Sequence, residues 1–294
     1  MKRVAMLFLI LIGACGSQVQ SGVGERQPHW TFPLAPPEAR NYAITFDEEF
    51  DGPISLRDEK DTSTDRGRWN QRYWYGAAGF YSSHDDWSQG TVMSRSWHGF
   101  DLLSQSNGIL SMRGDKRPAN APAEKFGNRP YLNSLLTTEG SFSQRYGYFE
   151  ARLRAPAAAG YWPTFWLWCL NDSAEIDIAE FQTRERGSVY GSTHQRTAPG
   201  TFRKLPTQVD KTDEMAPSGF DITKWHVYGL LWTENTLEWL IDGKITKKYD
   251  NHPFHEPCFV ILSNGPGGWS DENKVVSQFG ASLDVDYVRV GALR

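Results

Sequence analysis

Three carboxylates lie close together in the segment 173–182, which reads SAEIDIAEFQ. Glu175, Asp177 and Glu180 alternate with apolar residues, as in a strand that buries one of its faces. Carboxylates at such short range repel one another, and burying an ionised carboxylate costs several kcal/mol unless it is paired or used. Two carboxyls whose pKa values are pushed apart can act as acid and nucleophile in one reaction, which would account for this spacing.

The spacing predicts an irregular strand. In a regular strand Glu180 would point away from the other two acids, because side chains alternate between the faces. One extra residue between Asp177 and Glu180, a β-bulge, would return Glu180 to the face of Glu175. The two glutamates could then approach to the ~5 to 5.5 Å used by retaining glycosidases. Asp177 would share a proton with one glutamate, and its charge would raise the pKa of the other.

The amino-acid composition indicates which kinds of molecule the protein could bind. The chain has 294 residues, a formal net charge of -4 and scattered Lys and Arg, so it lacks the basic stripe that a phosphate backbone requires. A nucleic acid partner is therefore not expected. Aromatics make up 14% of the residues, with 12 Trp, and their flat apolar faces suit the C–H faces of sugar rings. No set of His, Cys and carboxylates has metal-ligand spacing, so we expect no catalytic cofactor.

The N-terminus has the form of an export signal. Lys2 and Arg3 precede an apolar run over 4–12, which is too short to span a membrane, and the small residues of IGAC follow. We predict a signal peptide over 1–15. IGAC also resembles a bacterial lipobox, in which Cys15 would be lipidated and become the mature N-terminus; ordinary cleavage after a small residue is the alternative. We expect an exported protein: a periplasmic or cell-surface lipoprotein with a lipid anchor, otherwise a secreted one.

The remaining chain divides into a tether and one domain. Residues 16–40 are rich in Gly, Ser, Gln and Pro without a period, which predicts a flexible linker. Residues 41–294 are predicted to form the catalytic domain, and we expect a monomer. With Cys15 assigned to the signal, Cys169 and Cys258 remain in apolar surroundings, where two free thiols and one disulfide are both open.

The domain reads as all-β. Short segments rich in Val, Ile, Tyr, Phe and Trp alternate with Gly, Asp, Asn and Pro, and no long stretch keeps a 3.6-residue period. The clearest hairpins lie in 226–250, with one turn at TENT and a second at Asp242-Gly243, a dipeptide that tolerates positive φ. Many antiparallel strands in about 250 residues predict two packed sheets, a sandwich or jelly roll.

Several motifs together resemble glycoside hydrolase family 16. The segment 146–181 contains Gly-aromatic-Glu-x-Arg, Trp-Pro-x-x-Trp and Glu-x-Asp-x-x-Glu in the order of that family. FDEEFDG at 46–52 resembles its first strand, WHVYGLLWTENTLEWLIDGK its late hairpin, and DVDYVRV at 284–290 its closing strand. The resemblance covers about 45–291.

The resemblance implies a concanavalin A-like β-jelly-roll sandwich of two antiparallel sheets with an open substrate cleft. It implies retaining endo-hydrolysis of a β-linked polysaccharide, with Glu175 as nucleophile, Asp177 as assisting residue and Glu180 as acid/base. The bulged spacing matches laminarinases, agarases and carrageenases. We expect a β-1,3 or β-1,3/1,4-glucan as substrate. A bacterial exopolysaccharide or galactan, transglycosylation, and noncatalytic carbohydrate binding are the alternatives, and the polar CLND before Glu175 departs from laminarinases.

Further residues are expected to bind substrate. Alternation in GYFEARL puts Glu150 and Arg152 on one face, as cleft residues or as a surface ion pair. Of Trp162 and Trp166, both near the nucleophile strand, we expect one as a stacking platform and the other as core, with Trp162 favoured as the platform. The resemblance adds His194 on the next strand, with a plain turn histidine as the alternative, and the Asn and Gly-Gly-Trp region of Asn264 and Trp269. The long aromatic-bearing loop over 76–98 could wall the cleft, with Trp87 as a contact. The candidates are Glu150, Arg152, Trp162, Trp166, His194, Asn264, Trp269 and Trp87.

A structural metal is also implied by the resemblance. Members of the family often bind calcium on the convex face, through acids and backbone oxygens near the first and last strands. The matching positions are Glu49, the carbonyl of Gly108, and Asp286. Their oxygens are ligands that Ca²⁺ accepts.

Overall fold

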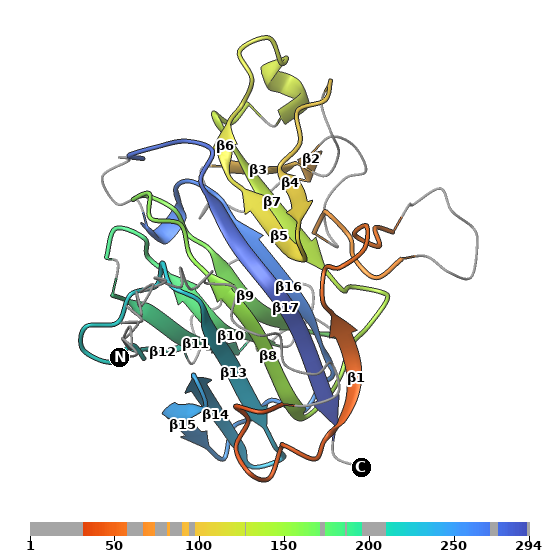
Figure 1. Ribbon diagram of the computed structural model, residues 1–294, viewed down its shortest axis with the longest axis vertical. Coiled ribbons are helices and arrows are strands. Elements are labelled where there is room, and N and C mark those ends of the chain that lie inside the picture. Colours follow the sequence, from red (N-terminus) through yellow and green to blue (C-terminus); the bar gives the residue numbers. More distant parts are fainter. Residues whose placement is uncertain are drawn as a thin grey trace, which may run out of the picture.

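The protein folds into two stacked β-sheets (Figure 1). The computed structural model describes residues 32–57, 67–73, 81–82, 90–93, 98–126, 128–170, 174–185, 187–195, 210–270 and 276–292. Two short 3₁₀ turns, η1 (Ala123–Phe126) and η3 (Gly268–Ser270), accompany the strands. Within these ranges no helix is long and apolar enough to cross a membrane. The all-β jelly roll expected from the short apolar segments is confirmed.

The first sheet carries the segment with the three carboxylates, and the described residues give it nine strands. Their order is β12 (Asp210–Glu214), β11 (Val189–Gln195), β10 (Ala174–Phe181), β9 (Thr164–Cys169), β16 (Cys258–Asn264), β7 (Tyr131–Thr137), β3 (Gly90–Met93) and β2 (Tyr81–Ser82). The short β6 (Asp115–Lys116) also pairs with β7. The pairing is antiparallel except between β3 and β7, which run parallel.

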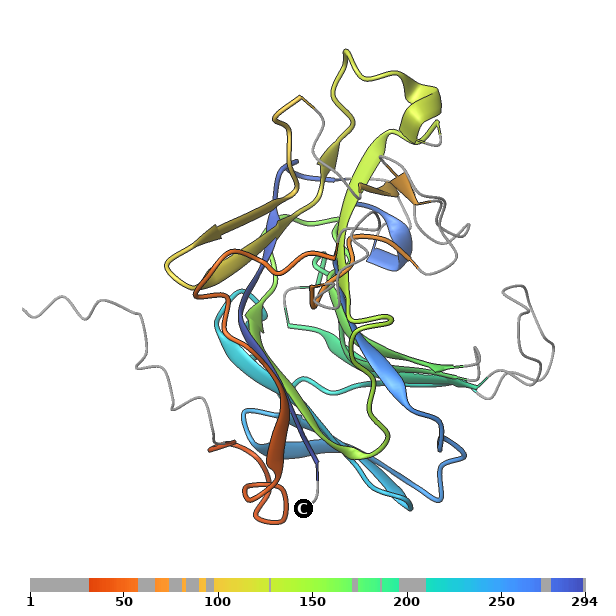
Figure 2. The same ribbon diagram turned by 90° about the vertical axis from the view of Figure 1, so that its right-hand side faces the viewer.

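The second sheet has eight strands among the described residues. Their order is β15 (Lys244–Asp250), β14 (Thr236–Ile241), β13 (His226–Trp232), β8 (Gly147–Arg154), β17 (Ser282–Ala292), β5 (Ile109–Arg113) and β4 (Leu103–Ser106), and β1 (Ala43–Glu48) pairs with β17. Figure 2 shows the two layers from the side. The first and last strands of the domain, far apart in the sequence, therefore lie next to each other.

The hydrophobic core lies between the sheets, where alternate residues of both meet. On β8, Phe149, Ala151 and Leu153 are fully buried in this core, as the alternation of GYFEARL predicts. On β10 the core residues are Ala174, Ile176, Ile178, Ala179 and Phe181. Two consecutive residues, Ile178 and Ala179, thus face inward, which is a break in the period of two.

The two predicted hairpins of 226–250 are confirmed. Strands β13, β14 and β15 follow one another with antiparallel pairing. Asp242 and Gly243 have φ values of 48° and 77° between β14 and β15, the positive values that a two-residue hairpin turn requires. The side chain of Asp242 also accepts a hydrogen bond from the Val227 backbone N–H at 2.9 Å. This hairpin forms one edge of the eight-stranded sheet.

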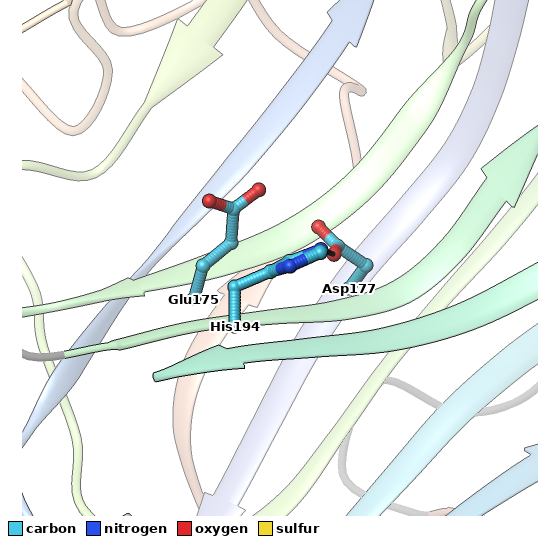
Figure 3. A group of neighbouring side chains, drawn as sticks. All are labelled: Glu175, Asp177 and His194. Atoms are coloured by element: carbon cyan, nitrogen blue, oxygen red, sulfur yellow. Dashed lines mark ion pairs between the residues drawn. The ribbon is translucent and has the colours of Figure 1, made fainter. Parts of the chain in front are cut away.

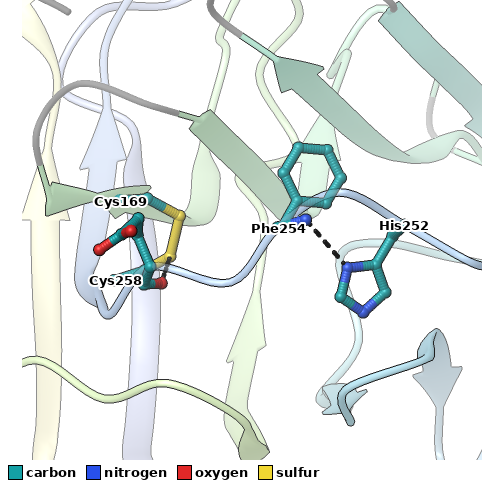
Figure 4. Close-up of a disulfide and its surroundings, with 5 residues drawn as sticks. Cys169, His252, Phe254 and Cys258 are labelled. Atoms are coloured by element: carbon teal, nitrogen blue, oxygen red, sulfur yellow. Dashed lines mark hydrogen bonds between the residues drawn. A yellow bond between two sulfur atoms is a disulfide. The ribbon is translucent and has the colours of Figure 1, made fainter.

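A disulfide joins Cys169 on β9 to Cys258 on β16 (Figure 4). The two residues are direct partners in the antiparallel register, and both lie in the core. Their separation of 89 residues means that the bond closes a long loop, a constraint worth about 4.6 kcal/mol in the chain-entropy model. It fastens β9, the neighbour of β10, to β16, and it decides between the two states that the sequence left open.

The folded domain begins earlier than residue 41. Phe32, Ala35 and Ala39 are buried against Tyr148 and other residues on the outer face of the eight-stranded sheet. The rings of Phe32 and Tyr148 meet edge to face, with centroids 5.3 Å apart. The predicted linker boundary at residue 40 is therefore wrong by at least nine residues, because these apolar side chains cover part of the sheet. Residues 1–31, with the predicted signal, lie outside the described residues.

Candidate active site

The three carboxylates project from β10 on the face away from the core. A shift in register between Asp177 and Glu180, seen against β11, marks the predicted β-bulge. Against β9 the shift lies between Asp177 and Ala179. Because Ile178 and Ala179 both turn into the core, Glu180 emerges on the same face as Glu175. The bulge thus brings the three acids together.

Glu180 lies in a buried, hydrogen-bonded position. Its side chain is 6% exposed; Ser192 donates to Oε2 at 2.7 Å, and the indole of Trp162 donates to Oε1 at 3.3 Å. Burial raises the pKa of Glu180 to about 7, the nearby charge of Glu175 adds to the rise, and the Ser192 bond opposes it. A carboxyl with this pKa can hold a proton near neutral pH and donate it.

Asp177 is more deeply buried, between the two glutamates. Burial and the charges of Glu180 and Glu175 raise the pKa of Asp177 well above its ordinary value, against a hydrogen bond from His194. His194 stands opposite Glu175 on β11, with Nε2 3.4 Å from Asp177 Oδ2. Figure 3 shows the side chains of Glu175, Asp177 and His194 gathered on the same side of the sheet. One ligand atom from each lies within 4.8 Å of the others.

Aromatic side chains border the Glu180 end of this group. Trp162 and Trp269 meet edge to face with ring centroids 6.4 Å apart, and Trp269 lies 4.8 Å from the ring of Tyr190. All three are half-buried. Gly268, with φ of 67°, lets the Trp162 ring approach, since a Cβ there would lie 2.1 Å from Trp162 Cε3. Trp162 and Trp269 are thus brought to the site.

Trp166 belongs to an apolar cluster on the same outer face. It pairs with Asp177 across β9 and β10, and it is 8% exposed. The cluster, which we call the β9 cluster, contains Tyr73, Val92, Leu135, Trp166, Trp168, Phe259 and Ile261. Trp166 is therefore packed next to the carboxylates, at 8% exposure, and is not an open stacking surface.

The structure does not bring Glu150 and Arg152 to this site. Both lie on β8, in the other sheet, and their side chains face away from the core. Glu150 is fully buried beside Arg289, its partner in the register of β17, and Arg152 pairs with Asp286 at 2.7 Å. The predicted cleft role of both is wrong, because alternation separates two faces of a strand but does not say which sheet the strand joins.

Asn264 also points away from the site. Its side-chain amide donates to the carbonyls of Met112 at 2.7 Å and Ala281 at 3.1 Å, inside the molecule. Asn264 is 1% exposed and ties β16 to the opposite sheet. The expectation that Asn264 contacts sugar is therefore wrong. Trp87 lies outside the described residues.

The expected calcium positions lie around β17. Glu49 Oε1 accepts a hydrogen bond from Arg289 Nε at 2.7 Å, and Asp286 Oδ2 accepts one from Arg152 at the same distance. Gly108 forms the turn between β4 and β5, and β5 pairs with β17 next to Asp286. The oxygens suit Ca²⁺, but an arginine already balances each acid, so the fit is partial.

Two residues of the site were not found from the sequence. Ser192 donates to Glu180, and Tyr190 borders Trp269. Both lie on β11 at alternate positions before His194, on the face that His194 shares. The alternation of residues along 190–194 could therefore have placed Tyr190 and Ser192 on the same face as His194.

A jelly roll whose bulged strand carries three interacting carboxylates, two of them buried, defines a class, the glycoside hydrolases with this fold. The sequence profile described as "Glycosyl hydrolases family 16" matches residues 87–275. The chain therefore belongs to glycosyl hydrolase family 16.

Relatives agree with this membership. The chain is 27% identical over 255 residues to endo-1,3-1,4-beta-glycanase ExsH of Rhizobium meliloti, covering 85% of this chain and 51% of ExsH. It is 26% identical over 322 residues to the beta-glucanase of Rhodothermus marinus, covering 99% of this chain and 94% of the relative. The chain thus spans about half the length of ExsH.

Solved structures show the same fold. The catalytic domain of an endo-1,3-beta-glucanase (laminarinase) from Thermotoga petrophila RKU-1 superposes with a TM-score of 0.65 at 22% identity. The superposition covers 86% of this chain and 98% of that one.

Proposed function

We propose that the protein is a retaining endo-β-glycanase that hydrolyses internal bonds of a β-1,3 or β-1,3/1,4-glucan. The observation that carries this proposal is the placement of Glu175, Asp177 and Glu180 on one face of a bulged strand, with the pKa of Glu180 at about 7. The names of the relatives support the choice of a mixed or β-1,3-linked glucan.

In the first step, the carboxylate of Glu175 attacks the anomeric carbon. A bond from carbon to Glu175 oxygen forms as the glycosidic bond breaks, and Glu180 donates its proton to the departing sugar oxygen. Glu180 suits this role because burial keeps it protonated near neutral pH. Ser192 and Trp162 hold the carboxyl in place from two directions.

In the second step, Glu180 acts as a base. Its carboxylate takes a proton from water, whose oxygen attacks the anomeric carbon and releases Glu175 with retained configuration. Burial and the neighbouring glutamates raise the pKa of Asp177, and in its protonated form it can donate a hydrogen bond to the departing Glu175 carboxylate. In this scheme His194 orients Asp177 from the neighbouring strand.

The half-buried aromatic side chains are proposed as sugar contacts. Trp162 and Trp269 border Glu180, where the leaving sugar would lie, and present apolar ring faces. His194 borders Glu175 on the other side. Trp87 stays a proposal for the wall of the cleft.

A panel of polysaccharides tests the proposal. Laminarin, lichenan, agarose, carrageenan, xyloglucan and bacterial exopolysaccharides are assayed for new reducing ends, with Glu175→Gln as the inactive control. Cleavage of laminarin or lichenan, with a rapid fall in viscosity, supports an endo-glucanase. Cleavage of a galactan or exopolysaccharide alone would replace the glucan. Early products longer than the substrate would make the enzyme a transglycosylase, and binding without cleavage a sugar-binding protein.

We further propose export through the signal at 1–15, with lipidation of Cys15. The Cys169–Cys258 disulfide supports this, because such bonds persist in oxidising compartments. Replacing Cys15 with Ser should move the protein from the membrane fraction to the soluble one. Equal partitioning of both forms would contradict a lipid anchor.

A calcium ion at Glu49, Gly108 and Asp286, and a monomeric state, complete the proposal. Chelation should lower the melting temperature if calcium binds there, and an unchanged value would count against it. Light scattering of the purified protein measures the oligomeric state.

A further inference from the structure

The bulge that positions Glu180 receives a hydrogen bond from the opposite sheet. Ile178 has no partner in the register of either β9 or β11. Directly before it, the carbonyl of Asp177 accepts a hydrogen bond from the indole Nε1 of Trp239 at 2.8 Å. Trp239 lies on β14, in the eight-stranded sheet, and is fully buried. A side chain from the eight-stranded sheet thus contacts the β-bulge of the nine-stranded sheet.

The same indole also lies against β11. A Cβ on Gly191 would lie 2.9 Å from Trp239 Cδ1 and Nε1 and 2.6 Å from Met215 Sδ. Glycine at 191 therefore lets the ring reach past β11 to β10. The next residue, Ser192, donates to Glu180. Trp239 consequently contacts both β10, which carries Glu180, and β11, which carries the hydrogen-bond donor Ser192.

A buried lysine completes this contact. Lys247 on β15 is the register partner of Trp239, and its ammonium lies 4.6 Å from the Trp239 ring centroid. Lys247 Nζ donates to the carbonyl of Gly191 at 2.7 Å and pairs with Asp213 of β12 at 3.0 Å. With a side chain only 6% exposed, the ammonium links three strands across the layers.

We propose that Trp239 and Lys247 are positioning residues of the active site, which hold the bulge of β10 and the backbone of β11 from the opposite sheet. The inference rests on the proposed retaining hydrolysis. It assigns a role to the 236–250 hairpin, which the mechanism does not otherwise use. Trp239 acts through the Asp177 carbonyl, and Lys247 acts through the Gly191 carbonyl.

A pair of tryptophan substitutions tests this role. Trp239→Phe keeps an aromatic ring but removes the N–H, so the Asp177 carbonyl loses the hydrogen bond from the opposite sheet. Trp232→Phe is the matched control, because Trp232 is a fully buried tryptophan of the same core whose Nε1 has no hydrogen-bond partner among the described residues. Both changes remove similar volume, so they separate loss of the hydrogen bond from loss of packing.

We expect Trp239→Phe to lower kcat on the best glucan by roughly 10- to 100-fold with KM within about threefold, since a small misplacement of reacting groups costs this much. Trp232→Phe should change kcat by less than about threefold. The alkaline limb of the pH–rate profile should move to higher pH only in Trp239→Phe, as the Ser192 bond to Glu180 weakens. Glu180 also faces Glu175, Asp177 and His194, which both variants keep. Equal kcat values and pH profiles for the two variants would overturn the proposal.

A second pair covers the case in which Trp239→Phe does not fold. Lys247→Met removes the ammonium, and Lys248→Met, an exposed lysine paired with Glu238 and Asp250, is its control. Lys247→Met should lower kcat by about fivefold or more, whereas Lys248→Met should match the wild type. Unchanged kcat in Lys247→Met would overturn the role of this residue. If the wild type cleaves no glycan at all, the proposed function fails, which is a different outcome from matched variants of an active enzyme.

Discussion

The outer faces of the two sheets both carry wholly or partly buried acids, but they balance the negative charge of these acids differently. On the eight-stranded sheet each of three acids has an arginine: Asp286 pairs with Arg152, Asp284 with Arg154, and Glu49 with Arg289. On the nine-stranded sheet Glu175, Asp177 and Glu180 mainly face one another and His194. An acid paired with an arginine stabilises a surface, whereas the close approach of other acids helps raise the pKa values of Asp177 and Glu180, as chemistry requires.

Glu150 combines features of both faces, because it has an arginine neighbour and also a raised pKa. It is fully buried on the arginine-rich face, and burial raises its pKa to about 7 although Arg289 opposes the rise. The value matches that of Glu180. A raised pKa therefore does not by itself mark an active site, and the position relative to the other acids decides.

The largest effect should come from the two glutamates of the proposed mechanism. We expect Glu175→Ala and Glu180→Ala each to lower kcat by at least about 10⁴-fold on a glucan. With azide and an activated aryl glycoside, Glu175→Ala should give an inverted product, because azide enters from the vacated side. Glu180→Ala should give a retained product. NMR of the glycosyl azides distinguishes the two, and the opposite pattern would exchange the assigned roles.

Removing Arg289 from the outer face of the eight-stranded sheet should lower stability and leave activity largely unchanged. Arg289→Met leaves Glu49 and Glu150 buried without their positive neighbour, which should cost about 3–5 kcal/mol of unfolding free energy. Urea denaturation measures this, and kcat per folded molecule should stay within about twofold of the wild type. A large loss of kcat in a stable Arg289→Met variant would show that the two faces are coupled.

Glu150 should make the stability depend on pH. Because its folded pKa is above its ordinary value, the folded state binds more protons than the unfolded state between about pH 4.5 and 7, so stability falls as pH rises through this window. The rise from 4.5 to about 7 corresponds to at most about 3 kcal/mol. Glu150→Gln should therefore lose less stability between pH 5 and 8 than the wild type. The melting temperatures of both at each pH measure this, and parallel curves would contradict it.

Asp177→Asn should reduce activity while leaving the stereochemistry unchanged. The amide keeps the shape of the side chain but cannot share a proton with either glutamate, so the separation of their pKa values changes. We expect roughly tenfold lower kcat, about the effect of one pKa unit. Product anomers measured by NMR should remain retained, and an inverted product would contradict the assisting role.

The smallest effect should follow from Ser192→Ala. The Ser192 hydrogen bond lowers the pKa of Glu180, so its loss should raise that pKa further. The alkaline limb of kcat/KM, which in the wild type falls as pH rises through about 7, should move to higher pH. Thr193→Val, a buried hydroxyl whose Oγ1 has no partner among the described residues, is the control and should leave the limb in place.

Much of the fold could be predicted from local pattern. Alternation in GYFEARL identified the core face of β8, and the dipeptide Asp242-Gly243 identified the hairpin turn, because both depend on neighbouring residues alone. The spacing Glu-x-Asp-x-x-Glu identified the bulge for the same reason, since it breaks the period of two. The family resemblance then supplied the architecture, a jelly roll of two antiparallel sheets.

The errors concern contacts between distant segments. Glu150 and Arg152 were assigned to the wrong sheet, Asn264 was expected in the cleft, and residues 32–40 were expected to be a linker. Each of these positions depends on which distant strand or segment packs against it, and the local sequence pattern does not show this. The disulfide between Cys169 and Cys258 was undecided until their strands were seen to pair.

The sequence by itself determined that three carboxylates share one face of a bulged strand, because side-chain direction along a strand follows from the backbone period. Only the tertiary structure decided what surrounds them: His194 and Ser192 from β11, Trp162 from the segment before β9, and Trp239 from the opposite sheet. Those contacts join residues up to 62 positions apart, and they set the burial that raises the pKa values of Asp177 and Glu180. The residue types are thus written in one short segment, whereas their reactivity arises from the packing of two sheets.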